Sequence, residues 1–304
     1  MGENDVAIQM VAILGTMLAI IGGLISIQTP EKKNGGNYLP SPSTQPSKRA
    51  YEQFALAYTP MWMFAFVCIV AFGWYESFDE WSYLRVCGGL ASPFLLQPIL
   101  LPSAGYDSPD AKRPLFERYS FKANVWIAVY SFIGNYWYTH YFYSVLKAKY
   151  TMPAHRLNNV PIALFFATHF YFSTYHTFSN LMLRKVVTSY QKGFLRSLLF
   201  VSVVLCFSYF TAFMETLTIS AYPDYSFEDR DMAYTVGSAF YGIYFIVSFP
   251  AFFLFDDDID NAATRKVTVY DSFLSSCGHG MMIMILLDFV RLYLDVPLIV
   301  GTLR

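Results

Sequence analysis

The chain has 304 residues, of which 55% are hydrophobic, 19% are aromatic and only 14% are charged. This composition is typical of a protein with several membrane spans and argues against a soluble globular domain. The formal net charge of −1 gives no indication of a nucleic-acid partner.

A helix needs about 20 apolar residues to cross a bilayer, and several stretches of this chain approach that length. The sequence therefore predicts an all-α, polytopic membrane bundle of about 7–8 transmembrane helices. Gly88, Gly89, Pro93 and Pro98 fall within one stretch and predict a kink or a re-entrant turn there. The expected spans cover residues 6–27, 54–75, 83–101, 121–146, 160–183, 194–221, 234–255 and 269–294.

Residues 1–27 are predicted to form a membrane anchor. A cleaved signal peptide is the alternative, but the apolar core is long and Asp5 precedes it where basic residues are usual. Residues 28–50 are rich in Pro, Ser, Asn and Gly, so a flexible linker is expected. The main helical domain is then expected at 51–295, followed by a short tail at 296–304.

Basic residues collect in alternate connections between the expected spans. The intervening connections YESFDEW and PDYSFEDRD are rich in acidic residues instead. By the positive-inside rule, the basic connections are expected in the cytosol. The residues that indicate this side are Lys32, Lys33, Lys48, Arg49, Lys112, Arg113, Arg118, Lys122, Arg184, Lys185, Lys192, Arg196, Arg265 and Lys266.

Polar residues inside the expected spans follow helical faces, since positions three, four or seven apart lie on one side of a helix. Interhelical hydrogen bonding is the simplest explanation for the serines and threonines. Asparagine and histidine at membrane depth more often face an interior cavity. Three such faces are His169, Ser173, His176 and Asn180; Asn124, Ser131, Asn135 and Tyr138; and Tyr136, His140 and Tyr143.

Two carboxyl groups also lie within expected spans. A carboxyl group at the position of Glu215 can remain neutral in an apolar site and act as a general acid. Asp288 has Arg291 one turn away, which favours a structural ion pair. No metal is expected, because His169 and His176 lie two turns apart, about 10 Å by helical rise. The sequence contains no phosphate-binding loop and no nucleophile elbow.

The stretch ANVWIAVYSFIGNYWYTHYFYSVL, followed by NNVPIALFFATHFYFSTYH, resembles the cycloeucalenol cycloisomerase family. The resemblance continues through YTPMWM, AFMETLTISAYPDYSF, YGIYFIVSFP and ILLDFVRLYL, and covers about residues 51–295. The chain departs from the family in its first 50 residues and in the acidic run DDDID at 256–260.

This resemblance implies an isomerase of sterol biosynthesis in the endoplasmic reticulum membrane. The family opens the 9β,19-cyclopropane ring of a sterol by protonating the carbon that becomes the C19 methyl. Loss of a proton from C8 then gives a Δ8 sterol, obtusifoliol. Nothing is oxidised, so the resemblance implies no cofactor. A sterol substrate and membrane lipid are the expected partners.

The residue types present can be assigned to that chemistry as hypotheses. The acid is expected among Glu215 and Asp288, and the base among His140, His169 and His176. Aromatic faces stabilise a cation, and the candidates are Tyr136, Trp137, Tyr138, Tyr241 and Tyr244. Candidate anchors for the 3-hydroxyl are Asn135, Asn158 and Asn159.

Two other functions remain open from the sequence. One is a non-catalytic lipid-binding or scaffold subunit on the same fold, in which residues 1–50 dock a partner in a larger membrane complex. The other is a transporter or channel, which would predict internal repeats that this sequence does not show.

Overall fold

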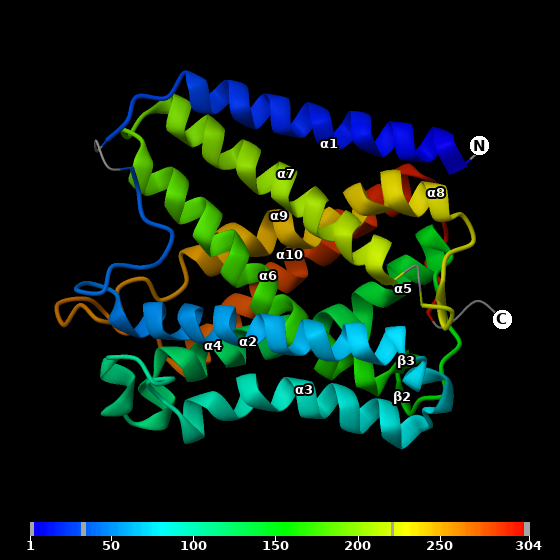
Figure 1. Ribbon diagram of the computed structural model, residues 1–304, viewed down its shortest axis with the longest axis horizontal. Coiled ribbons are helices and arrows are strands. Elements are labelled where there is room, and N and C mark those ends of the chain that lie inside the picture. The colour runs from blue at the N-terminus through cyan, green and yellow to red at the C-terminus, as the bar shows by residue number, and fades with distance from the viewer. Residues whose placement is uncertain (1–2, 32–34, 220–221, 301–304) are drawn as a thin grey trace.

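The computed structural model describes residues 3–31, 35–219 and 222–300, and long helices that lie side by side account for most of them (Figure 1). The α-helices are α1 (Glu3–Ser26), α2 (Pro46–Ala71), α3 (Glu80–Leu100), α4 (Tyr119–Ile133), α5 (Thr139–Tyr141), α6 (Ile162–Ser189), α7 (Phe194–Ile219), α8 (Arg230–Met232), α9 (Ser238–Phe253) and α10 (Val269–Tyr293).

Shorter elements connect or interrupt these helices. The 3₁₀-helices are η1 (Trp74–Ser77), η2 (Pro109–Ala111) and η3 (Leu115–Glu117), and the π-helical turns are η4 (Gly134–Tyr138), η5 (Phe142–Leu146) and η6 (Ala233–Gly237). The strands β1 (Lys149–Tyr150) and β4 (Tyr225–Ser226) pair antiparallel, as do β2 (Arg156–Leu157) and β3 (Val160–Pro161).

Each predicted span coincides with a helical segment, so the all-α membrane class is confirmed. Five segments within the described residues are long and apolar enough to cross a membrane: α1, α2, α7, α8 together with α9, and α10. Whether α3, the α4–η5 segment and α6 also cross stays a prediction, and so does the count of 7–8 spans. The predicted re-entrant turn at 83–101 is wrong, because α3 is one helix that contains Pro93 and Pro98.

Local sequence sets where several helices begin. Pro46 occupies the first turn of α2, where its missing N–H costs nothing, so this helix begins inside the stretch expected to be a linker. Asp79 caps α3 by accepting a hydrogen bond from the Ser82 backbone. Thr268 and Asp271 form a capping box at the start of α10, each accepting from the other's backbone N–H.

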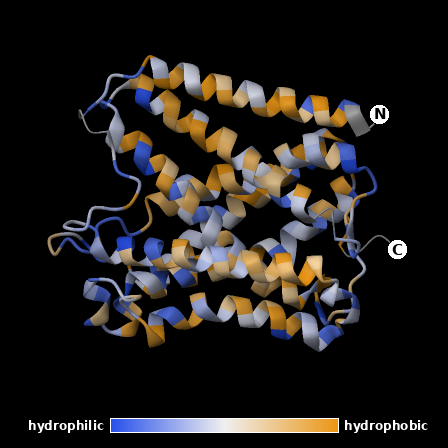
Figure 2. Cartoon of the chain, viewed as in Figure 1, coloured by the Kyte–Doolittle hydropathy of each residue, from blue (hydrophilic) through white to orange (hydrophobic). Residues whose placement is uncertain are grey.

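The basic connections meet at one end of the bundle. Figure 1 shows the α1–α2, α3–α4, α6–α7 and α9–α10 connections together at the left, as the sequence predicts. Hydrophilic residues gather at the two ends of the helices and apolar residues lie between them (Figure 2). This pattern suits a bundle whose two ends face water across a membrane.

The described part of the 28–50 stretch packs against α6. The backbone N–H of Glu31 donates to the Ser189 carbonyl at 2.8 Å, and that of Asn37 donates to Thr188 Oγ1 at 2.8 Å. Gly36 lies so close to α6 that an added Cβ would clash with the side chain of Thr188. The helix α1 contacts α7, while most of its remaining surface is exposed and apolar.

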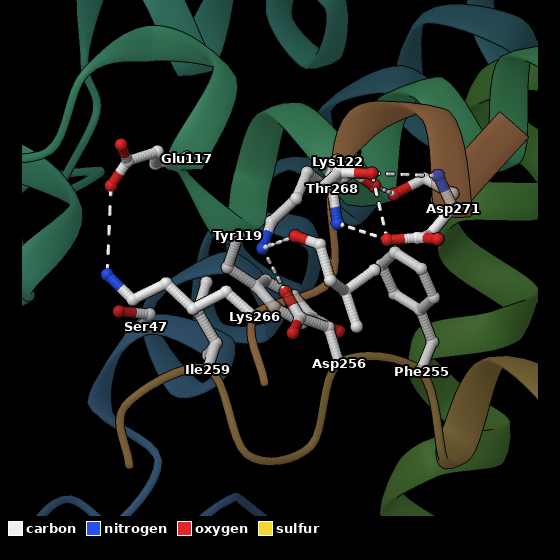
Figure 3. Close-up of polar contacts among 12 residues, drawn as sticks. Ser47, Glu117, Tyr119, Lys122, Phe255, Asp256, Ile259, Lys266, Thr268 and Asp271 are labelled. Atoms are coloured by element: carbon white, nitrogen blue, oxygen red, sulfur yellow. Dashed lines mark hydrogen bonds and ion pairs between the residues drawn. The ribbon is translucent and has the colours of Figure 1, made fainter. Parts of the chain in front are cut away.

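Buried charges hold the basic end together (Figure 3). Lys122 of α4 is 1% exposed, and its ammonium pairs with Asp256 and donates to the Val267 carbonyl at 3.0 Å. Lys48 pairs in the same way with Asp257. The acidic run at 256–260 therefore neutralises buried basic residues of α2 and α4.

Aromatic side chains from α4, η4, η5, α6 and α9 form the largest core, and α10 packs against it. Gly280 of α10 marks the closest approach, where the Tyr138 hydroxyl donates to the Gly280 carbonyl at 2.6 Å. A Cβ added at Gly280 would meet Ile133 Cδ1 at 2.9 Å and the Tyr138 hydroxyl at 3.0 Å. The core at this point has no room for a methyl group.

We expect Gly280→Ala to lower the free energy of unfolding by about 1–3 kcal/mol, the usual cost of overpacking. Thermal unfolding in detergent measures the effect. Gly278→Ala in the same helix is the matched control, because its Cβ would meet no described atom within 4 Å. Equal melting temperatures for the two variants would contradict this reading of the α4–α10 contact.

Candidate active site

Glu215 of α7 turns its carboxyl group into the bundle. The residue is half-buried, and its Oε2 atom is fully buried with no hydrogen-bond partner among the described residues. Tyr241 of α9 and Tyr175 of α6 lie close enough for their hydroxyls to interact with the carboxyl group. A carboxyl group kept from water can remain neutral and so donate a proton.

Tyrosines from five elements surround this carboxyl group. Tyr150 of β1 stacks on Tyr225 of β4 with 4.5 Å between ring centroids, so the small β1–β4 pair contributes to the enclosure. Because aromatic faces attract cations, the enclosure suits a reaction that passes through a carbocation. The side chains that interact electrostatically with Glu215 are Tyr130, Tyr150, Tyr171, Tyr175, Tyr225 and Tyr241.

Three of the five predicted aromatic residues lie together beside this enclosure. The ring of Tyr244 lies 4.7 Å from that of Tyr138 and 4.9 Å from that of Tyr241, measured between centroids. All three are buried. The other two are apart: Tyr136 is 38% exposed, and Trp137 packs against His140.

The π-helical turns explain why the predicted face of Tyr136, His140 and Tyr143 is wrong. An α-helical period would place the three on one side, whereas Tyr136 is exposed and the other two are fully buried. Each π turn adds a residue per turn and so rotates the residues that follow.

The three candidate histidines occupy different surroundings. His169 Nε2 lies 2.9 Å from Asn124 Oδ1. His176 contacts the Phe172 carbonyl through Nδ1 and the Ser248 hydroxyl through Nε2. His140 lies beside the Asn158 side chain.

The candidate asparagines lie in two places. Asn135 donates to the Ser131 carbonyl at 2.8 Å and to Thr168 Oγ1 at 2.7 Å, so it joins η4 to α6. Asn158 and Asn159 form the turn between β2 and β3, both with a positive φ angle. Asn158 Nδ2 donates to the Tyr136 carbonyl at 2.5 Å, so this turn contacts η4 one residue beyond Asn135.

Asp288 lies apart from Glu215, on the outer side of α10. Its Oδ1 atom accepts from Arg291 Nε at 2.8 Å and from the Tyr141 hydroxyl at 3.5 Å. The predicted ion pair with Arg291 is therefore confirmed. The carboxylate borders an open groove of about 300 Å³, lined by Tyr141, Met281, Met284, Ile285, Asp288 and Phe289.

Sequence reasoning missed several residues of this enclosure, among them Tyr175 and Tyr130. Tyr175 directly precedes His176, and only the packing of α6 against α7 shows that it faces Glu215. Within the described ranges, no three His, Cys, Asp or Glu side chains gather where they could hold a metal ion.

Fold and site together define a polytopic membrane protein whose interior encloses a carboxyl group with aromatic side chains, as an apolar substrate requires. The chain is 41% identical over 262 residues to cycloeucalenol cycloisomerase of Arabidopsis thaliana, and the match covers 84% of this chain and 90% of that protein. The chain therefore belongs to the cycloeucalenol cycloisomerase family, a family of isomerases, as its motifs predict.

No protein-family model and no solved structure shows a significant match to this chain.

Proposed function

We propose that this protein opens the 9β,19-cyclopropane ring of cycloeucalenol-type sterols and releases a Δ8 sterol, obtusifoliol. The observation that carries the proposal is the Glu215 carboxyl group, enclosed by tyrosines in a member of this family. Protonating a carbon–carbon bond requires a well-aimed acid in a site that excludes water. Glu215 has such surroundings.

In the proposed reaction, the sterol gains one proton at C19 and loses another from C8. The Glu215 carboxyl group gives its proton to C19 while the C9–C19 bond breaks, which leaves a methyl group at C19 and a cation at C9. The faces of Tyr241 and Tyr244 stabilise that cation. Loss of the C8 proton forms the C8–C9 double bond and completes the isomerisation.

Asp288 is suited to binding the substrate and not to donating the proton. Its carboxylate is already paired with Arg291. The groove beside it is lined mostly by apolar residues of α10, and its open side faces the surroundings of the bundle. We infer that a sterol approaches from the bilayer through this groove and places its 3-hydroxyl against Asp288. The protein then works in the endoplasmic reticulum membrane with its basic end in the cytosol.

Asp288→Asn is expected to raise KM about tenfold and to change kcat less, because it weakens one hydrogen bond to a charged acceptor. Steady-state turnover over a range of sterol concentrations in detergent micelles measures both constants. Asp295→Asn is the matched control, since Asp295 is exposed beyond the end of α10. Complete loss of kcat in Asp288→Asn would instead assign the acid role to Asp288.

Expression in a host that lacks its own cyclopropylsterol isomerase tests the proposed function. Membranes from that host are given cycloeucalenol, and sterols are identified by mass spectrometry. We expect obtusifoliol to accumulate. Well-folded protein that converts neither cycloeucalenol nor related cyclopropyl sterols would reject the proposal and favour a non-catalytic role.

A further inference from the structure

The reaction proposed above needs a group that takes the C8 proton, and the hydrogen bonds distinguish among the histidines. His169 Nε2 faces the Asn124 amide, whose Nδ2 donates to the Ser120 carbonyl at 2.8 Å. That orientation leaves the amide oxygen of Asn124 as an acceptor, so His169 Nε2 is the donor. No hydroxyl group takes part in this contact.

His176 has the opposite arrangement. Its Nδ1 atom lies 2.7 Å from the Phe172 carbonyl, and a carbonyl can only accept, so Nδ1 carries the proton. In the neutral ring, Nε2 is then a free acceptor. Ser248 Oγ lies 2.9 Å from Nε2, where its hydroxyl can donate. His176 Nε2 can therefore accept a proton from the Ser248 hydroxyl.

Ser248 in turn contacts Tyr130. Ser248 Oγ donates to the Tyr130 hydroxyl oxygen, 3.2 Å away. A hydroxyl group rotates about its C–O bond, so Ser248 can instead turn its proton toward His176 Nε2. When Ser248 donates to His176, it can accept from Tyr130. Tyr130, Ser248 and His176 are each 0% exposed, so bulk water does not interrupt this row.

The Tyr130 end of the row faces the proposed site of chemistry. The Tyr130 ring packs on Phe172 with 5.0 Å between centroids, and the Phe172 ring lies 6.4 Å from that of Tyr175, which contacts Glu215. Glu215 of α7 and Tyr130 of α4 therefore lie in the same aromatic interior of the bundle.

We propose that Tyr130, Ser248 and His176 form a relay that removes the C8 proton, with His176 as its final acceptor. This inference rests on the proposed function. The C8–H bond breaks and its electron pair forms the C8–C9 double bond. The proton passes to the Tyr130 oxygen, the Tyr130 proton to Ser248, and the Ser248 proton to His176 Nε2. After the product leaves, the proton returns through Ser248 and Tyr130 to the water that replaces it, and Glu215 takes up a proton from the same water, which restores the starting state.

Turnover of cycloeucalenol in D₂O tests the relay with Ser248→Ala. We expect Δ8 product formation to fall about 100-fold, the lower range for loss of general base catalysis. The C9 cation then persists and recloses, so recovered substrate gains deuterium at C19. Ser248→Thr keeps the hydroxyl and should restore turnover without deuterium in the substrate. A merely structural role for Ser248 would lower turnover without that exchange.

The possible outcomes separate the two proposals. Ser248→Ala with turnover near that of the wild type, or with reduced turnover and unlabelled substrate, would overturn the relay alone. Tyr130→Phe provides a second variant and should show the same exchange as Ser248→Ala. If the wild-type protein forms no Δ8 sterol, the proposed function fails and the relay fails with it.

Discussion

Glu215→Gln is expected to reduce cycloeucalenol turnover by about 10³-fold, within the range for loss of a general acid. Glutamine has nearly the shape of a neutral glutamic acid but has no acidic proton. Its amide can still contact Tyr175 and Tyr241, so the fold should be retained. Turnover of the purified variant, together with its melting temperature, measures the effect.

Glu76→Gln is the matched control, because Glu76 is exposed in η1 at a helix end. It should leave turnover within about twofold, as expected for a surface substitution. Unchanged turnover in Glu215→Gln would remove Glu215 from the mechanism. In that case Asp288 would be the next carboxyl group to test.

The second large effect concerns the ion pair between Lys122 and Asp256. Lys122→Met should lower the free energy of unfolding by about 3–5 kcal/mol, because it leaves the Asp256 carboxylate buried and unpaired. A second substitution, Asp256→Asn, should recover much of this loss, because it removes the orphaned charge and tolerates the positive φ angle of this position. Chemical unfolding in mild detergent measures all three proteins.

Lys266→Met is the control for the loss of a lysine at the basic end of the bundle. Lys266 and Glu117 lie 3.8 Å apart with side chains 59% and 52% exposed, and such a pair contributes about 0–1 kcal/mol. Equal losses in the free energy of unfolding for the two lysine substitutions would show that burial does not increase the contribution of the Lys122–Asp256 pair to stability.

The destabilisation of Lys122→Met should also depend on pH. Burial raises the pKa of the Asp256 carboxyl above its ordinary value, and Lys122 opposes that shift. Removing Lys122 therefore raises this pKa further. An acid with a raised folded pKa gains relative stability as the pH falls, since the folded state then binds more protons than the unfolded state. The variant should be less impaired in mild acid than above neutral pH.

The sequence predicted the helices well because each span is determined locally by a run of apolar residues. Glu215 could be predicted for a related reason: a carboxyl group is unusual in such a run. The π-helical turns could not be predicted, since they extend an apolar pattern that an α-helix fits equally well. Within η4, Tyr136 lies at the surface and Tyr138 in the core.

The residues that contact Glu215 depend on packing between distant segments. Tyr175 and Tyr241 reach Glu215 from separate helices, and Ser248 reaches His176 across 72 positions of the chain. The acidic run at 256–260 gave no sequence signal that its first two residues pair with Lys122 and Lys48. Only the tertiary structure shows these contacts.

The most direct measurement is wild-type turnover of cycloeucalenol in D₂O, with the label in the product located by mass spectrometry and NMR. Proton donation from Glu215 to C19 predicts one deuterium in the C19 methyl group of the Δ8 sterol and none elsewhere in the ring system. A Δ8 product without deuterium at C19, or no conversion by folded protein, would contradict the proposed ring opening.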